Sequence, residues 1–165
     1  MSLECPMAFY SLTVHPTNIL TSCMLSENKL ASVGEKDGLD NASFQALRQN
    51  MIDGKWSKHN CETCMVAEQK GLVSSRMKWR ENVRDTMEKF NIGWNLKNNP
   101  IGHLNINLNN VCNFKCRMCG PKYSNAWIPD AKHIRKQDPS IVRDWNDGEA
   151  KQFVDYFKLL ELYGN

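Results

Sequence analysis

Three cysteines lie within eight positions near the middle of the chain, in the segment NNVCNFKCRMCGPKYSNAW at residues 109–127. They are Cys112, Cys116 and Cys119, separated by three and then by two residues. Clustered thiolates are ligands for zinc and for iron–sulfur clusters. Three thiolates around a cubane of four irons leave one iron without a protein ligand, so that iron can bind an outside molecule. The spacing therefore predicts a 4Fe–4S site with one open iron.

A zinc knuckle and a set of unliganded thiols are alternatives for these three cysteines. A structural zinc ion takes four protein ligands. No histidine follows closely, because His133 lies 14 positions after Cys119. An iron–sulfur electron carrier is a further alternative, but a carrier normally has a cysteine on every iron. The spacing favours the cluster with an open iron over each of these.

Four further cysteines precede this loop, namely Cys5, Cys23, Cys61 and Cys64. An odd total of seven, with no signal peptide, argues against a disulfide framework and indicates a reducing cytoplasm. Four thiolates can saturate an auxiliary 4Fe–4S cluster, which would carry electrons or act as a structural staple. A structural zinc site uses the same ligand set, so zinc stays open as the competing interpretation.

The segment CNFKCRMC at residues 112–119 resembles the cluster motif of the radical S-adenosylmethionine (SAM) superfamily. The resemblance implies that the open iron takes the amino and carboxylate groups of SAM. It also implies reductive cleavage of SAM to a 5′-deoxyadenosyl radical, which abstracts hydrogen from a substrate. Met118 stands where that family commonly has an aromatic residue near the adenine, and a thioether can pack on a purine face. Met118 is therefore the expected SAM contact.

The four earlier cysteines resemble those of SPASM and twitch modules, which hold auxiliary iron–sulfur clusters. Their opening pattern is present as C-x12-N-x4-C between Cys5 and Cys23, with Asn18 in place of a glycine. Asparagine best tolerates a left-handed turn after glycine, so the replacement is physically cheap. A radical SAM family with a twitch module before its barrel shares a further pattern, found here as Gly54, Cys61, Cys64, Glu68, Gly71, Ser75 and Arg76. The segment CGPKYSNAW at 119–127 also resembles that family's cluster loop.

The resemblance implies an α/β fold, α+β overall, in two parts. Residues 1–94 would form a small cysteine-rich twitch module, built from a β-hairpin and helices. The residues predict the hairpin over 6–23, a loop over 26–42, a helix over 43–53 that ends at Gly54, and a short helical turn after Cys64 that reaches Gly71. A longer helix over 74–90 carries Trp79, Val83, Met87 and Phe90 at helical spacing, which indicates core packing.

Residues 100–165 would begin a radical SAM partial TIM barrel after a linker at 95–102. Residues 103–108 alternate as a strand, with Leu104, Ile106 and Leu108 on one face. The three-cysteine loop follows this strand directly, where active sites of parallel barrels lie. A last helix is predicted over 147–163. The chain contains no GGE motif, which ends the second barrel strand in that family, so we expect an N-terminal fragment that is inactive alone.

The resemblance implies a radical SAM enzyme fragment that binds SAM and accepts electrons from an external donor. It also implies a peptide or a small molecule as the substrate. The alternative is a non-catalytic module in which four cysteines bind zinc or an iron–sulfur cluster. The formal net charge of +3 is small and its charges are interspersed, so no nucleic acid is expected as a partner. No apolar run is long enough to predict a membrane span.

Overall fold

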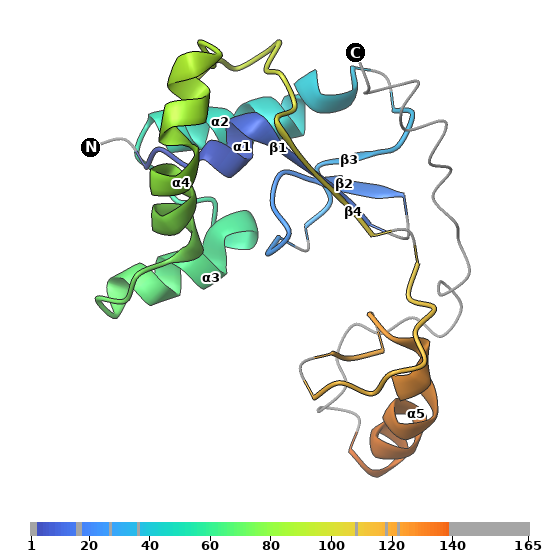
Figure 1. Ribbon diagram of the computed structural model, residues 1–165. Coiled ribbons are helices and arrows are strands. Elements are labelled where there is room, and N and C mark those ends of the chain that lie inside the picture. The colour runs from blue at the N-terminus through green and yellow to red at the C-terminus, as the bar shows by residue number, and fades with distance from the viewer. Residues whose placement is uncertain are drawn as a thin grey trace.

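The described part of the chain is an open mixed sheet with helices packed against it, followed by a cysteine-containing loop and one more helix (Figure 1). The computed structural model describes residues 3–15, 18–26, 28–35, 37–107, 109–117, 119–121 and 123–138. These residues form five α-helices, two short 3-10 helices and four strands. The expected mixture of α and β structure is confirmed, whereas the described strands form an open sheet and no barrel.

The sheet has the strand order β3-β2-β1-β4. Its strands are β1 (Ser11–Val14), β2 (Ile19–Thr21), β3 (Ala31–Ser32) and β4 (His103–Ile106). The first three are antiparallel neighbours, and β4 runs parallel to β1 with His103 opposite Ser11. A parallel pair needs a long crossover, which the helices between β3 and β4 supply. The strand expected at 103–108 therefore joins the sheet that the N-terminal hairpin begins.

The predicted hairpin is confirmed in β1 and β2, which pair with Thr13 opposite Thr21. Asn18, at the start of the returning strand, has a left-handed φ of 59° and donates its N–H to the His15 carbonyl at 3.0 Å. This is the conformation for which asparagine is the best substitute for glycine. The hairpin is shorter than the predicted segment, because residues 6–10 form helix α1 (Pro6–Tyr10) instead of a strand. Pro6 favours a helix start there, since its fixed φ suits the first helical turn.

Helices α2 (Ala42–Ile52) and α4 (Ser75–Lys89) confirm the two predicted helices within one residue at each end. The side chain of Asn41 caps α2 by accepting the Phe44 N–H at 3.0 Å. Ser74 caps α4 in the same way by accepting the N–H of Met77. Each cap satisfies one of the N–H groups that a helix start leaves without an internal partner.

Helix α3 (Lys58–Gln69) corrects the prediction for the CxxC segment. The helix begins three residues before Cys61, so both cysteines lie inside it, and the helical turn does not start after them. Gly71 follows with a φ of 71°, as expected for a glycine that ends a helix. Residues three apart on a helix share a face, so α3 presents both thiols on one side.

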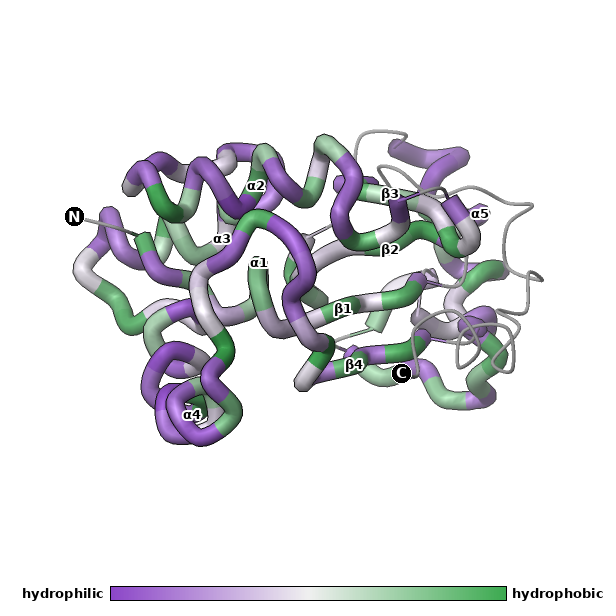
Figure 2. Tube along the Cα trace, turned by 90° about the horizontal axis from the view of Figure 1, so that it is seen from above, coloured by the Kyte–Doolittle hydropathy of each residue, from purple (hydrophilic) through white to green (hydrophobic). Residues whose placement is uncertain are grey.

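The main core lies between the sheet and the first two helices. It contains Ala8, Phe9, Leu12, Val14, Leu20, Leu30, Ala31, Phe44, Leu47 and Met51, all buried. In Figure 2 the strands β1, β2 and β4 carry green hydrophobic segments, whereas α4 is largely purple. A smaller hydrophobic cluster packs α4 against the rest of the fold, with Val83 and Met87 of α4 buried together with Tyr10. Trp79 packs against this cluster as predicted, but Phe90 is 65% exposed because it lies past the end of α4.

Strand β4 fits the expected alternation only in part. Ile106 packs against the main core, but Leu104, on the same face of this edge strand, is 43% exposed. Leu108 lies outside the described residues. Just before β4, Gly102 donates its N–H to the Tyr10 carbonyl at 2.9 Å. A Cβ at residue 102 would lie 1.7 Å from the Tyr10 ring, so the close approach of these segments requires glycine.

Several segments hold structure that the sequence did not indicate. The expected loop at 26–42 contains β3 and a 3-10 turn at Gly38–Asp40. After the three-cysteine loop come a second 3-10 turn, Asn125–Trp127, and helix α5 (Ile128–Gln137). The helix predicted at 147–163 lies outside the described residues. Within the described ranges, no helix combines the length and apolar character needed to cross a bilayer.

Candidate metal centre

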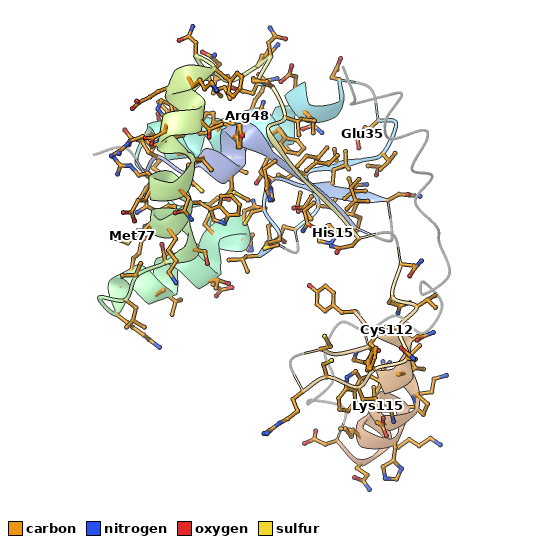
Figure 3. All side chains as sticks on the ribbon, in the orientation of Figure 1. His15, Glu35, Arg48, Met77, Cys112 and Lys115 are labelled. Atoms are coloured by element: carbon orange, nitrogen blue, oxygen red, sulfur yellow. The ribbon has the colours of Figure 1, made fainter. Side chains whose placement is uncertain are left out.

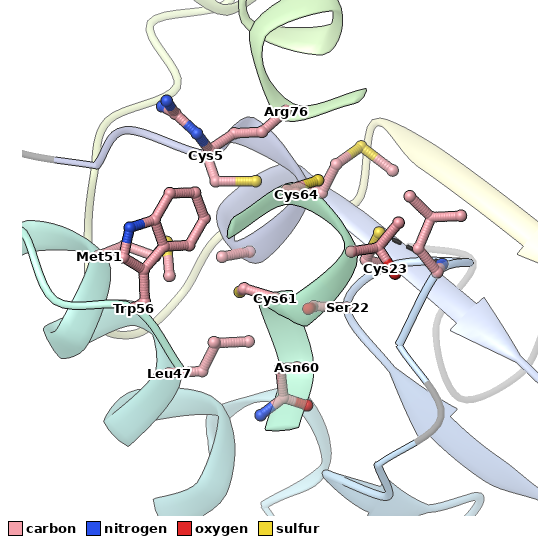
Figure 4. A pocket seen from close by; sticks show the side chains of 14 residues that line it. Cys5, Ser22, Cys23, Leu47, Met51, Trp56, Asn60, Cys61, Cys64 and Arg76 are labelled. Atoms are coloured by element: carbon pink, nitrogen blue, oxygen red, sulfur yellow. Dashed lines mark hydrogen bonds between the residues drawn. The ribbon is translucent and has the colours of Figure 1, made fainter. Parts of the chain in front are cut away.

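The four N-terminal cysteines line one pocket, although they are spread over about 60 residues of sequence. Cys5 is the residue before the first turn of α1, Cys23 follows strand β2, and Cys61 and Cys64 lie on α3. Figure 4 shows the four side chains around this pocket together with Trp56 and Arg76. The cavity volume is about 30 Å³. We call this site the four-cysteine pocket.

Hydrogen bonds to the carbonyl and to the sulfur of Cys23 hold this residue in place on the pocket lining. The Thr21 hydroxyl donates to the Cys23 carbonyl at 2.9 Å, and the Ser26 N–H donates to the same carbonyl at 3.0 Å. The Leu25 N–H in turn donates to Cys23 Sγ at 3.4 Å. An N–H that points at a sulfur favours the thiolate over the thiol, because it stabilises the negative charge.

Burial favours the protonated form of three of the pocket thiols. It raises the pKa of Cys5 to about 12 and that of Cys61 to about 11, and it also raises the pKa of Cys23. The charge of neighbouring thiolates raises each of these pKa values further. Such a set of groups gains most from a cation, since a metal ion or cluster replaces the protons and removes the repulsion between thiolates.

Arg76 joins the cysteine pocket to the helices behind it. Its Nε and Nη2 atoms donate to the two carboxylate oxygens of Glu68 at 2.9 and 2.6 Å. Its Nη1 donates to the carbonyls of Leu3 and Glu4 at 2.9 and 3.3 Å, immediately before Cys5. The guanidinium carbon lies 5.5 Å from the centroid of the Trp56 ring. One side chain thus fixes the segment that carries Cys5 against α3 and α4.

The four cysteines line one pocket, but their side chains are not as close together as the ligands of a single metal ion. In the described ranges, no three or more His, Cys, Asp or Glu side chains lie close enough together to hold one metal ion. All seven cysteines are free thiols. The pocket therefore holds a shared, half-buried set of four sulfur donors.

The other three cysteines lie on the loop that follows β4, as predicted. Cys116 is exposed, and Cys112 and Cys119 are half-buried. Figure 3 shows Cys112 and Lys115 apart from the sheet on which His15 lies, and Figure 1 shows the same separation for the whole loop and α5. The structure therefore divides the seven cysteines into four half-buried thiols that line one pocket and three, one of them exposed, on a separate loop. Met118 lies outside the described residues.

The segment after Cys119 folds back and holds the three-cysteine loop in shape. Ser124 is 1% exposed, and its hydroxyl lies 2.7 Å from the Phe114 carbonyl and 3.2 Å from the Cys112 carbonyl, so it can donate to either. Asn125 accepts the Cys112 N–H through its Oδ1 at 3.1 Å. The indole of Trp127 donates to the Cys116 carbonyl at 3.2 Å. These bonds satisfy backbone groups that an irregular loop cannot pair internally.

Further side chains complete this loop. Asn110 is buried, and its Nδ2 donates to the Pro121 carbonyl at 2.9 Å. Within the described ranges, its Oδ1 has no hydrogen-bond partner. Lys115 forms an ion pair with Asp130 on α5 and lies 5.9 Å from the centroid of the Trp127 ring. The loop is therefore fastened to the helix that follows it.

Sequence reasoning missed Asn110, Ser124 and Asn125, although all three lie in or beside the segment that carries the resemblance. The residue types could have indicated them, because small side chains with hydroxyl or amide groups in an irregular loop commonly form hydrogen bonds with backbone groups.

Comparison of the chain with known proteins finds no match among family models, curated proteins or solved structures. The interpretation of both cysteine sets therefore rests on the residues and their geometry.

Proposed function

We propose that this chain is the cluster-binding part of a radical SAM enzyme. The three-cysteine loop would hold the SAM-binding 4Fe–4S cluster, and the four-cysteine pocket would hold an auxiliary 4Fe–4S cluster. The observation that carries the proposal is the division of the cysteines. Four half-buried cysteines from three distant segments converge on one pocket, while three, one of them exposed, stay together on a separate loop. These are the ligand counts of a saturated cluster and of a cluster with an open iron.

The four-cysteine pocket fits a saturated cluster in the chemistry of its donors. It offers four thiols, the Leu25 N–H directed at one sulfur, and the cation of Arg76 on its lining. Hydrogen bonds to sulfur and nearby positive charge both stabilise the negative charge of a thiolate-bound cluster. Burial among apolar side chains such as Leu47 and Met51 limits access of water. This environment suits electron transfer or structural support better than direct binding of a substrate.

The three-cysteine loop fits a cluster that must admit another molecule. Cys112, Cys116 and Cys119 would bind three irons, and the exposure of Cys116 leaves the loop open to solvent. A cluster held there would supply one electron to SAM, whose sulfur–carbon bond would break to give methionine and a 5′-deoxyadenosyl radical for hydrogen abstraction from a peptide or small molecule. Ser124, Asn125 and Trp127 would hold the loop backbone so that the three thiols keep their places.

The proposal also names the partners and the compartment. SAM and an external one-electron donor are required, and the substrate class is a peptide or small molecule. Reactive, uncrosslinked thiols persist in a reducing compartment, so a cytoplasmic location is part of the proposal.

A non-catalytic zinc module is the second candidate function, and the size of the pocket favours it. A cavity of about 30 Å³ holds a single ion more readily than a cubane of four irons and four sulfides. A tetrahedral zinc ion bound at about 2.3 Å would draw the four sulfurs together. In this case the three-cysteine loop would carry free thiols and no radical chemistry would follow.

Metal analysis after anaerobic reconstitution separates the two candidates. Iron, sulfide and zinc would be measured in the parent chain and in the Cys112→Ala/Cys116→Ala/Cys119→Ala variant. Two 4Fe–4S clusters predict about eight irons per chain, falling to about four in the variant. A Cys61→Ala/Cys64→Ala variant is the matched control and should lose the other four. About one zinc per chain, with no iron lost in the triple variant, would refute the radical mechanism.

A further inference from the structure

Arg76 is the one formally charged side chain among the described residues that line the four-cysteine pocket. It comes from the first turn of α4, and its side chain is only 11% exposed. Figure 4 shows it beside Cys5. Because this side chain is largely buried on the pocket wall, its charge differs from that of an ordinary surface arginine, which lies in solvent.

The side chain of Arg76 lines the same pocket as the four thiols, so its charge acts on any negative charge placed there. Glu68 binds two of the guanidinium nitrogens and does not line the pocket. The positive member of the ion pair therefore lies on the pocket wall, whereas its negative member does not.

The hydrogen bonds of Arg76 add a positional effect to the electrostatic one. Its Nη1 bonds to the Leu3 and Glu4 carbonyls hold the chain just before Cys5. Cys5 is the ligand farthest in sequence from the other three and has no disulfide to anchor it. A planar guanidinium can hold a carboxylate and two carbonyls at once, which a lysine ammonium cannot do with the same geometry.

We propose that Arg76 is the positioning and charge-balancing residue of the four-cysteine pocket, which holds Cys5 in place and stabilises the reduced state of the bound cluster. The inference rests on the proposed function, because it requires a cluster in that pocket. An external one-electron donor supplies the electron. Reduction then adds one negative charge to the cluster and leaves every bond to the protein in place. A cation at the pocket wall makes that added charge more favourable and so raises the reduction potential.

The test uses the reconstituted full chain with Cys112→Ala/Cys116→Ala/Cys119→Ala as parent, so that only the four-cysteine pocket holds a cluster. Dithionite in a mediator titration supplies the electrons, and the reduced cluster is followed by electron paramagnetic resonance. Arg76→Gln should lower the midpoint potential and the iron retained on desalting. Glu68→Gln should raise the potential, because it leaves Arg76 charged and removes the opposing carboxylate. Arg84→Gln is the matched control, since Arg84 lies on the same helix with its side chain 68% exposed and should change neither value.

Arg76→Lys separates charge from position. It should keep the potential near that of the parent but lose iron on desalting, because one ammonium cannot replace the bonds to Leu3, Glu4 and Glu68. If Arg76→Gln does not fold, as judged by circular dichroism, Arg76→Lys and Glu68→Gln decide the question. An unchanged midpoint potential in the cluster-loaded Arg76→Gln variant would overturn this inference and leave the proposed function standing. If Arg76→Gln does not fold, an unchanged midpoint potential in Glu68→Gln would do the same. A parent that takes up zinc and no iron would overturn both.

Discussion

Glu68 and Arg76 show how one pair of charged residues can link the cysteine pocket to the stability of the fold. The Arg76 side chain holds the pKa of Glu68 below its ordinary value through hydrogen bonds, with help from the Ser74 hydroxyl at 2.5 Å. Both side chains of the pair are largely buried. Because the folded state binds the Glu68 proton more weakly than the unfolded state does, the pair stabilises the fold above the ordinary pKa of a glutamate. That contribution is lost as the pH falls through the pKa of the folded state.

Glu68→Gln should therefore destabilise the metal-free chain in a pH-dependent way. At pH 7 the loss should be about 2 kcal/mol, the scale of a hydrogen-bonded charged group. The difference between variant and parent should shrink as the pH falls below the ordinary glutamate pKa, because the parent loses its charged carboxylate there. Urea unfolding followed by circular dichroism at pH 7 and at acid pH measures this. A difference that stays constant over the whole range would show that Glu68 is not the titrating group.

Among the elements, the β1–β2 hairpin depends on one residue with unusual backbone geometry. Asn18 adopts a φ of 59°, and its backbone makes two hydrogen bonds, from its own N–H to His15 and from the Val33 N–H to its carbonyl. These bonds tie the turn to the segment after β3. The hairpin ends two residues before Cys23, so the turn also sets where one ligand of the pocket lies.

Asn18→Gly should leave stability within about 0.5 kcal/mol of the parent, because glycine adopts the left-handed conformation freely. Asn18→Val should cost about 2 kcal/mol, since a β-branched side chain is strained at that φ. Urea midpoints of the two variants provide the comparison. Equal losses for glycine and valine would mean that the Asn18 side chain matters, and not the backbone conformation.

The loop after β4 is the second element whose shape depends on a few polar side chains. Ser124→Ala would remove the hydroxyl that can donate a hydrogen bond to the carbonyl of Cys112 or of Phe114. Both carbonyls would then lack that donor. A buried polar group that loses its partner costs about 1–3 kcal/mol. We expect the three-cysteine site to lose most of its reconstituted iron, while the four-cysteine pocket keeps its own. Ser43→Ala on the exposed side of α2 is the control and should keep all of its iron.

At the scale of the whole molecule, Arg48 connects three segments that are far apart in sequence. Its side chain is 4% exposed and donates to the carbonyls of Ala8 and Leu96 at 3.1 and 2.7 Å. It also pairs with Asp40 at 3.1 Å, and Asp40 in turn accepts the Asn98 N–H. Helix α1, the turn before α2 and the segment that leads to β4 thus meet at one guanidinium.

Arg48→Met should therefore destabilise the chain by about 3 kcal/mol, because it leaves two carbonyls and one carboxylate without their donor. Arg84→Met, at an exposed position on α4, should change stability by less than about 0.5 kcal/mol. Chemical denaturation of both variants gives the comparison. A loss at Arg48 no larger than that at Arg84 would show that the network contributes nothing net to the free energy of unfolding.

The sequence by itself determined the features that depend on neighbours along the chain. The helix starts near Asn41 and Ser74, the left-handed residue Asn18 and the strand predicted at 103–108, which is observed at His103–Ile106, all follow from local propensity and hydrogen bonding. The two groups of cysteines were also visible as spacing alone. Local rules succeed here because each feature requires only a few adjacent residues.

Only the tertiary structure decided which distant groups meet. It brought Cys5, Cys23 and the two cysteines of α3 together around one pocket, which Arg76 also lines. It also paired β4 with β1. It also placed Ser124 under the Cys112 loop. No local pattern encodes these contacts, because they depend on how the core around Phe9, Phe44 and Leu12 packs and on which buried polar groups find partners across it.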